Sequence, residues 1–88
     1  MDKLLNLLAA IQEENPYYHV EIIAADLDGY DFILNCKQEF TDNEVPTFRH
    51  DEVIKLLNDF GGYGYSSYVD GAKAESYKTH NIEILVKV

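Results

Sequence analysis

The chain has 88 residues, with 16 acidic side chains against 7 basic ones and a formal net charge of −9. A chain of this length predicts a single domain, residues 1–88, because domains cluster at roughly 100–150 residues. Hydrophobic residues make up 47% of the sequence, which is enough for an independent core. The acidic excess excludes direct nucleic-acid readers, because these need a basic face to neutralise phosphates.

The single cysteine, Cys36, excludes an intrachain disulfide. Small secreted domains usually carry several disulfides, so the cysteine content predicts a reducing compartment such as the cytoplasm. The apolar run near the N-terminus has no basic region before it and no small-residue cleavage site, so we expect no signal peptide. No apolar run approaches the ~18 residues of a membrane span, so we expect no membrane partner.

Apolar residues spaced three and four apart predict two helices. The first covers residues 2–14, and the Asn-Pro dipeptide at 15–16 ends it because the residue before proline avoids the α region. The second covers residues 49–60, and the Gly-Gly pair at 61–62 follows it in the position that commonly ends a helix. The apolar face of the first helix consists of Leu4, Leu7, Leu8 and Ile11.

Two strands are predicted at residues 17–27 and 30–40, separated by the dipeptide Asp-Gly. Asp-Gly between two apolar-rich runs favours a β-hairpin, because a type I′ turn needs positive φ at both central positions. A two-residue turn fixes the register, which places Asp26 opposite Asp31 on the outward face. The expected pairs on the helix-facing side are Leu27 with Tyr30, Ala25 with Phe32, Ile23 with Leu34, and Glu21 with Cys36.

The last third of the chain predicts further strands. Residues 63–69, which precede a second Asp-Gly dipeptide, favour a strand or hairpin over an irregular loop. Residues 82–88 alternate between apolar and polar side chains, as a half-buried strand does, and we expect them beside the first strand. The predicted class is α+β: an antiparallel sheet of three to four strands with two helices packed on one face, in the order α-β-β-α-(β)-β.

The acidic side chains are the most informative feature for function. No lysine or arginine occurs from residue 4 through residue 36. Like charges directly opposite in a sheet are destabilising, so the predicted pair of aspartates at the hairpin tip suits a cationic partner. Two alternatives stay open, namely solvated acids that aid solubility and a metal site. The candidate partner-binding carboxylates are Asp26, Asp28, Asp31, Glu39, Asp42 and Glu44.

The metal alternative matches the calcium-loop pattern poorly. With Gly29 at the sixth position of an EF-hand loop, Ala24 would occupy the first position and Asn35 the twelfth. Neither residue is the ligand that the pattern requires there. We therefore predict no metal and no cofactor.

Tyrosine is the second informative feature, since the chain has 7 Tyr and no Trp. Tyr63, Tyr65 and Tyr68 cluster with glycines after the second predicted helix. Tyrosine is common at interface hot spots, so these three are candidate anchors for a protein partner. The alternative is that their rings complete a small core while their hydroxyls remain in water.

No catalytic residues are predicted, and we expect the chain not to be an enzyme. Cys36 falls on the expected buried face of a strand, which is typical of an inert core thiol. Ser66 and Ser67 lack the context of a nucleophile elbow, and the 3 histidines lie far apart in the sequence.

The chain resembles the small acidic inhibitors of bacteriophages and mobile elements, such as anti-CRISPR proteins and DNA mimics. The shared features are short length, strong negative charge, no disulfide, mixed α and β elements, and many acids and tyrosines. The resemblance implies an inhibitor that blocks the nucleic-acid site of a nuclease or surveillance complex in the host-cell cytoplasm. It assigns no individual residue. The alternative function is a small structural or regulatory module that forms a homodimer, through residues 82–88 as a sheet edge or through the tyrosine segment.

Overall fold

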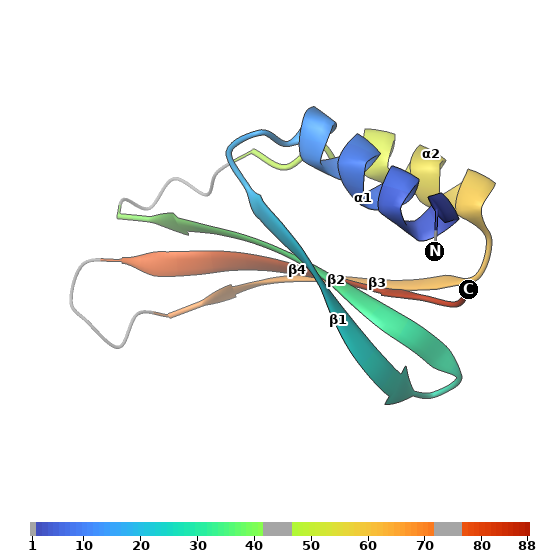
Figure 1. Ribbon diagram of the computed structural model, residues 1–88. Coiled ribbons are helices and arrows are strands. Elements are labelled where there is room, and N and C mark those ends of the chain that lie inside the picture. The colour runs from blue at the N-terminus through green and yellow to red at the C-terminus, as the bar shows by residue number, and fades with distance from the viewer. Residues whose placement is uncertain (1, 42–46, 72–76) are drawn as a thin grey trace.

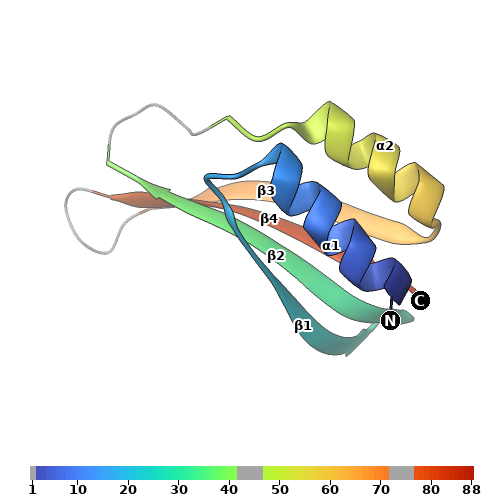
Figure 2. The same ribbon diagram turned by 45° about the horizontal axis from the view of Figure 1, so that its top comes forward.

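A computed structural model of the chain describes residues 2–41, 47–71 and 77–88 (Figure 1). Four strands form one antiparallel sheet, and two helices lie side by side on one of its faces (Figure 2). This arrangement confirms the predicted α+β class and the strand predicted at residues 63–69. In chain order the elements are α1 (Asp2–Glu14), β1 (His19–Leu27), β2 (Tyr30–Phe40), α2 (His50–Phe60), β3 (Tyr63–Asp70) and β4 (Lys78–Val86).

The order of the strands is β1-β2-β4-β3, so the prediction that the last strand lies beside the first was wrong. β4 pairs with β2 on one side and with β3 on the other. Its side chains Ile82, Ile84 and Val86 are all fully buried, which an inner strand beneath two helices achieves. Because β4 is an inner strand, residues 82–86 provide no free edge for self-association. The two edges belong to β1 and β3.

The register of the β1–β2 hairpin also differs from the prediction. Leu27 pairs with Tyr30 as expected, but a β-bulge between Ala24 and Leu27 moves the remaining pairs by one residue. Val20 and Ile22 therefore face the helices, opposite Cys36 and Leu34. The predicted register would have placed Glu21 in the core, whereas the bulge leaves that carboxylate in solvent.

The same bulge corrects the expectation for the aspartates at the hairpin tip. Asp26 lies in the irregular segment, so Asp26 and Asp31 do not form a regular cross-strand pair. Repulsion between directly opposed carboxylates is thus avoided by the backbone. The turn itself is as predicted, because Asp28 and Gly29 both have positive φ, at 54° and 84°.

The core lies between the helix layer and the sheet. Both predicted helical stripes point into it, and α1 and α2 run in opposite directions across the sheet (Figure 2). At one end of the helix pair, Lys3 Nζ donates a hydrogen bond to the Phe60 carbonyl at 2.7 Å. The fully buried side chains are Leu4, Ile11, Leu34, Cys36, Val53, Leu57, Ile82, Ile84 and Val86.

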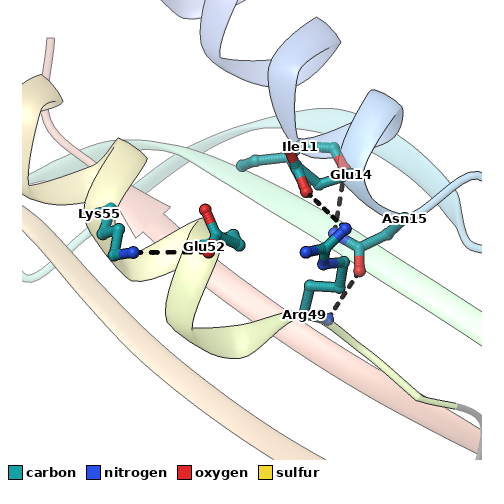
Figure 3. A network of polar contacts seen from close by, with 6 residues as sticks. All are labelled: Ile11, Glu14, Asn15, Arg49, Glu52 and Lys55. Carbon is teal, nitrogen blue, oxygen red and sulfur yellow. Dashed lines mark hydrogen bonds and ion pairs between the residues drawn. The ribbon is translucent and has the colours of Figure 1, made fainter.

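At the other end, Asn15 joins the end of α1 to the start of α2 (Figure 3). Its side-chain amide donates to the Ile11 carbonyl at 3.0 Å, and its Oδ1 accepts the Arg49 backbone N–H at 2.8 Å. Arg49 also forms an ion pair with Glu14 at 3.3 Å. These contacts satisfy a buried asparagine and fix the helix ends. Within the described residues, neither helix is long and apolar enough to cross a membrane.

We expect Leu34→Ala to lower the free energy of unfolding by about 2–5 kcal/mol, because Leu34 is fully buried on an inner strand. That is a large share of the stability of a small domain. Urea denaturation followed by circular dichroism measures the change. The control is Leu5→Ala, which removes a half-exposed side chain and should change stability by about 0.5 kcal/mol or less. Equal losses for the two variants would contradict this account of the core.

Candidate functional site

The end of the β1–β2 hairpin carries a group of free carboxylates. Asp26, Asp28 and Asp31 are all exposed, and the hairpin end curls away from the helix layer (Figure 1). None of the three takes part in an ion pair within the described part of the chain. Asp31 Oδ2 accepts the backbone N–H of Val88 at 3.0 Å, which still leaves its charge uncompensated.

Two exposed apolar side chains lie near these carboxylates in the sequence, Leu27 between Asp26 and Asp28 and Ile23 three residues before Asp26. Ile23 is 43% exposed and Leu27 is 51% exposed. Exposed apolar side chains near charged ones are a usual composition of protein-binding surfaces. We call Ile23, Leu27 and the three aspartates Asp26, Asp28 and Asp31 the hairpin patch.

The remaining candidate carboxylates do not join the hairpin patch. Glu39 is exposed near the opposite end of β2, eight residues from Asp31, or about 27 Å at the usual rise of a strand. Asp42 and Glu44 lie outside the described residues. A compact partner therefore cannot contact the hairpin tip and Glu39 through one small site.

The three candidate tyrosines point to different faces of β3. The rings of Tyr63 and Tyr65 pack against the core beneath the helices. The Tyr63 hydroxyl donates to Asn58 Oδ1 at 2.9 Å, and the Tyr65 hydroxyl is hydrogen-bonded to His50 Nδ1. Tyr68 lies on the open face of the sheet, where it is 43% exposed. The rings of Tyr63 and Tyr65 thus help to complete the core, as the alternative expected, but their hydroxyls are bonded to other side chains of the protein and do not simply remain in water.

Tyr68 is held by a short contact to the neighbouring strand. Its hydroxyl donates to Glu83 Oε1 at 2.5 Å. This hydrogen bond to a carboxylate raises the pKa of Tyr68 to about 12. The ring is thus fixed in orientation while one of its faces remains in solvent.

A second acidic region lines the groove between α1 and α2. Its walls carry Glu13, Glu14, Glu52 and Asp59, and Ala10 and Leu56 also line it. Two of these carboxylates are paired, Glu14 with Arg49 and Glu52 with Lys55 at 3.4 Å (Figure 3). This pairing reduces the local charge, so the groove offers a weaker cation site than the hairpin patch.

A cluster of histidines, tyrosines and a serine was not predicted. Ser67 Oγ lies 2.8 Å from His80 Nε2, and the Tyr18 hydroxyl lies 2.7 Å from His80 Nδ1. The rings of His50 and His80 are 6.3 Å apart between centroids. The members come from α2, β3, β4 and the segment before β1. The sequence did indicate that His80 is buried. His80 lies two residues before Ile82 and four before Ile84, so in a strand it shares their buried face.

The hydrogen bonds connect Ser67, His80 and Tyr18 in the order of a nucleophile, a base and an orienting group. The charge of the third group differs from that of a catalytic triad. In a catalytic triad the third group is an anion that stabilises the protonated imidazole. Burial raises the pKa of Tyr18 to about 12, so that hydroxyl is neutral at pH 7. The three side chains form a hydrogen-bonded polar network at the end of the core.

Cys36 is fully buried, as predicted for a core thiol. Burial raises its pKa to about 12, so the reactive thiolate is essentially absent at neutral pH. Among the residues that the structure describes, no three His, Cys, Asp or Glu side chains are grouped to hold a metal ion.

Comparison of the chain with protein-family models, with curated proteins and with solved structures found no match.

We expect the free energy of unfolding to fall as the pH rises from about 9 to 12. In the unfolded chain Cys36 and Tyr18 lose their protons near their ordinary pKa values of about 8.5 and 10. In the folded chain both pKa values are raised to about 12. The unfolded state therefore binds fewer protons in this window, so the stabilisation is complete below about pH 8.5 and is lost as the pH rises through the folded values.

Urea denaturation at several pH values measures this dependence. Cys36→Ala should be less stable at pH 7 because it leaves a small cavity, yet its stability should fall less steeply between pH 8.5 and 10. A wild-type stability that stays constant from pH 8 to 11 would refute the expectation, and so would an unchanged slope in the variant.

Proposed function

We propose that this protein is a non-enzymatic inhibitor that binds a basic, nucleic-acid-handling protein and blocks its nucleic-acid site. The hairpin patch is the observation that supports the proposal, because it holds three exposed carboxylates that no cation of the described chain neutralises. A protein surface that binds phosphates is rich in lysine and arginine. Carboxylates at the hairpin tip complement such a surface in charge.

The backbone of the hairpin favours binding at low entropic cost. The tight turn at Asp28-Gly29 and the adjacent bulge restrict the path of the chain. β2 is hydrogen-bonded on both sides, by β1 and by β4, so the hairpin is anchored to an inner strand. The backbone that carries these carboxylates is thus ordered before a partner arrives, which reduces the entropy lost on binding.

Charge and packing have separate roles in the proposed complex. Complementary charge raises the association rate and selects the partner, whereas a few desolvated side chains determine affinity. Ile23 and Leu27 are the exposed apolar side chains within the hairpin patch, so we assign them the anchoring role. We no longer propose Tyr63 and Tyr65 as anchors, because their rings pack against the core. Tyr68 and Glu39 remain candidates for a separate contact.

The absence of catalysis is part of the proposal. Two nucleophile candidates lack activation, because the Cys36 thiol is protonated and the group behind His80 is a neutral tyrosine. Inhibition would then result from occupation of the partner's site. The resemblance to phage-encoded inhibitors suggests CRISPR-associated or restriction nucleases in the cytoplasm as the partners to test.

The test measures binding of the purified protein to a panel of purified CRISPR-associated and restriction nucleases by biolayer interferometry. We expect at least one nuclease to bind and DNA to compete for the same site. The association rate should fall steeply when the salt concentration rises from about 50 to about 500 mM, because salt screens the attraction between exposed charges. The triple variant Asp26→Asn, Asp28→Asn and Asp31→Asn should reduce the association rate by about tenfold or more. Asparagine preserves both the positive φ at residue 28 and an acceptor at residue 31.

A matched triple variant controls for the overall change of charge. Asp2→Asn, Glu13→Gln and Asp59→Asn remove three exposed carboxylates from the helices, and they should reduce the rate much less. Nuclease activity should fall in proportion to binding. Association that is insensitive to salt, or equal loss in the two triple variants, would reject the hairpin patch as the binding site. No binding to any nuclease of the panel would reject the proposed class of partner.

A further inference from the structure

The edge of the sheet formed by β3 carries one charged residue, Asp70 at its end. From Tyr63 to Val69 the strand contains no charged residue and no proline, and its register with β4 has no bulge. The other edge, β1, carries Glu21 and Asp26 and is interrupted by a bulge. Charges and bulges are the usual means by which proteins prevent edge strands from pairing with other chains. They protect β1 and are missing from β3.

The structure also identifies which backbone groups of β3 point outward. The Lys87 N–H donates to the Gly62 carbonyl at 3.1 Å, so Gly62 directs its peptide groups toward β4. In an antiparallel ladder every second residue does the same, and the residues between them direct their N–H and C=O away. Among the described residues only β4 pairs with β3. The residues with outward-directed groups are therefore Tyr63, Tyr65, Ser67 and Val69.

We propose that a second copy of this chain pairs antiparallel with β3, with the two-fold axis at Ser66. In this register Tyr63 lies opposite Val69 of the second copy and Tyr65 lies opposite its Ser67. All four outward-directed residues then have partners in the other copy. A two-fold axis at Tyr65 or Ser67 would place one of these residues opposite a position beyond the strand. The register about Ser66 thus satisfies the most backbone groups.

The side chains of the open face fit the same register. Tyr68 lies opposite Gly64 of the second copy, and its ring stays directed toward Glu83 of its own chain, because Leu85 and Tyr30 already cover Gly64. Ser66 lies opposite Ser66 of the second copy, and two small hydroxyl side chains meet without repulsion.

The distribution of charge favours a second copy of this chain as the partner that pairs with β3. Each chain has a net charge of −9, so two copies approach most easily where the surface has no carboxylate. The strand Tyr63–Val69 carries no carboxylate of its own, and the nearby Glu83 carboxylate accepts the Tyr68 hydroxyl of the same chain. A basic strand from another protein gains no attraction from these residues, whereas an identical uncharged edge is complementary in both backbone and side chains.

The first experiment compares the mass of the full chain in solution with that of Ser66→Lys, by sedimentation equilibrium over a range of concentrations. We expect the wild type to reach twice the chain mass and the variant to remain at the monomer mass, because two ammonium groups would meet at the two-fold axis. Within its own chain Ser66 lies beside Glu83, so Glu83→Gln is introduced into both this variant and its control, to remove a carboxylate that would neutralise the lysine. The matched control Ala24→Lys, exposed on the β1 edge, should still dimerise. Circular dichroism verifies that both variants are folded.

The second experiment tests the register with Ser66→Cys. Directly opposed residues of a non-hydrogen-bonded pair have Cα atoms about 4.5 Å apart, which a disulfide can bridge. Mild oxidation should therefore link this variant into a covalent dimer, and Ala24→Cys should not be linked. The native Cys36 is buried and does not compete. A wild type that is monomeric at every concentration overturns the proposal, and so does a dimer that survives Ser66→Lys or links equally through residue 24.

Discussion

The pairing of β2 with β4 is the interaction on which the rest of this structure depends. It runs in one unbroken register from Phe32 opposite Val86 to Phe40 opposite Lys78. Within it Leu34 lies opposite Ile84, and both side chains are fully buried beneath the helices. This pairing joins the β1–β2 hairpin to the antiparallel pair β3–β4, and it provides most of the sheet surface on which α1 and α2 pack. In a chain of 88 residues that contact contributes a large share of the apolar area available.

The two proposed surfaces follow from that pairing because it assigns the edges of the sheet. With β2 and β4 inside, β1 and β3 become the outer strands at opposite sides of the molecule. β1 and its turn carry free carboxylates, whereas β3 is uncharged from Tyr63 to Val69. Association of two β3 edges would therefore leave both hairpin patches at the far ends of an extended sheet. Such a dimer would present two acidic sites at a fixed distance, which increases avidity for a partner with repeated basic sites.

The network around His80 has a structural role in this arrangement. It connects the segment before β1, through Tyr18, with β3, through Ser67. Phe48 packs edge-to-face on Tyr18 and on the ring of His50, so the approach to α2 belongs to the same cluster. The network lies at the end of α1 and the start of α2, where the apolar stripes of the helices end. Hydrogen-bonded aromatic side chains can close a core at such a boundary because their rings are buried while their polar atoms are satisfied.

The sequence by itself determined the local elements of this protein. The apolar spacing in α1 and α2, the Asn-Pro and Gly-Gly helix ends and the Asp-Gly turn depend on neighbouring residues, and all were predicted. The acidic character of the hairpin tip was also evident, although its grouping with Ile23 and Leu27 was not. Strand order, the faces of β1 and the directions of the tyrosines required the tertiary structure. A strand has two faces that alternation alone cannot distinguish, and only the contact with the helices decided that Val20 is buried and that Glu21 lies partly exposed on the other face.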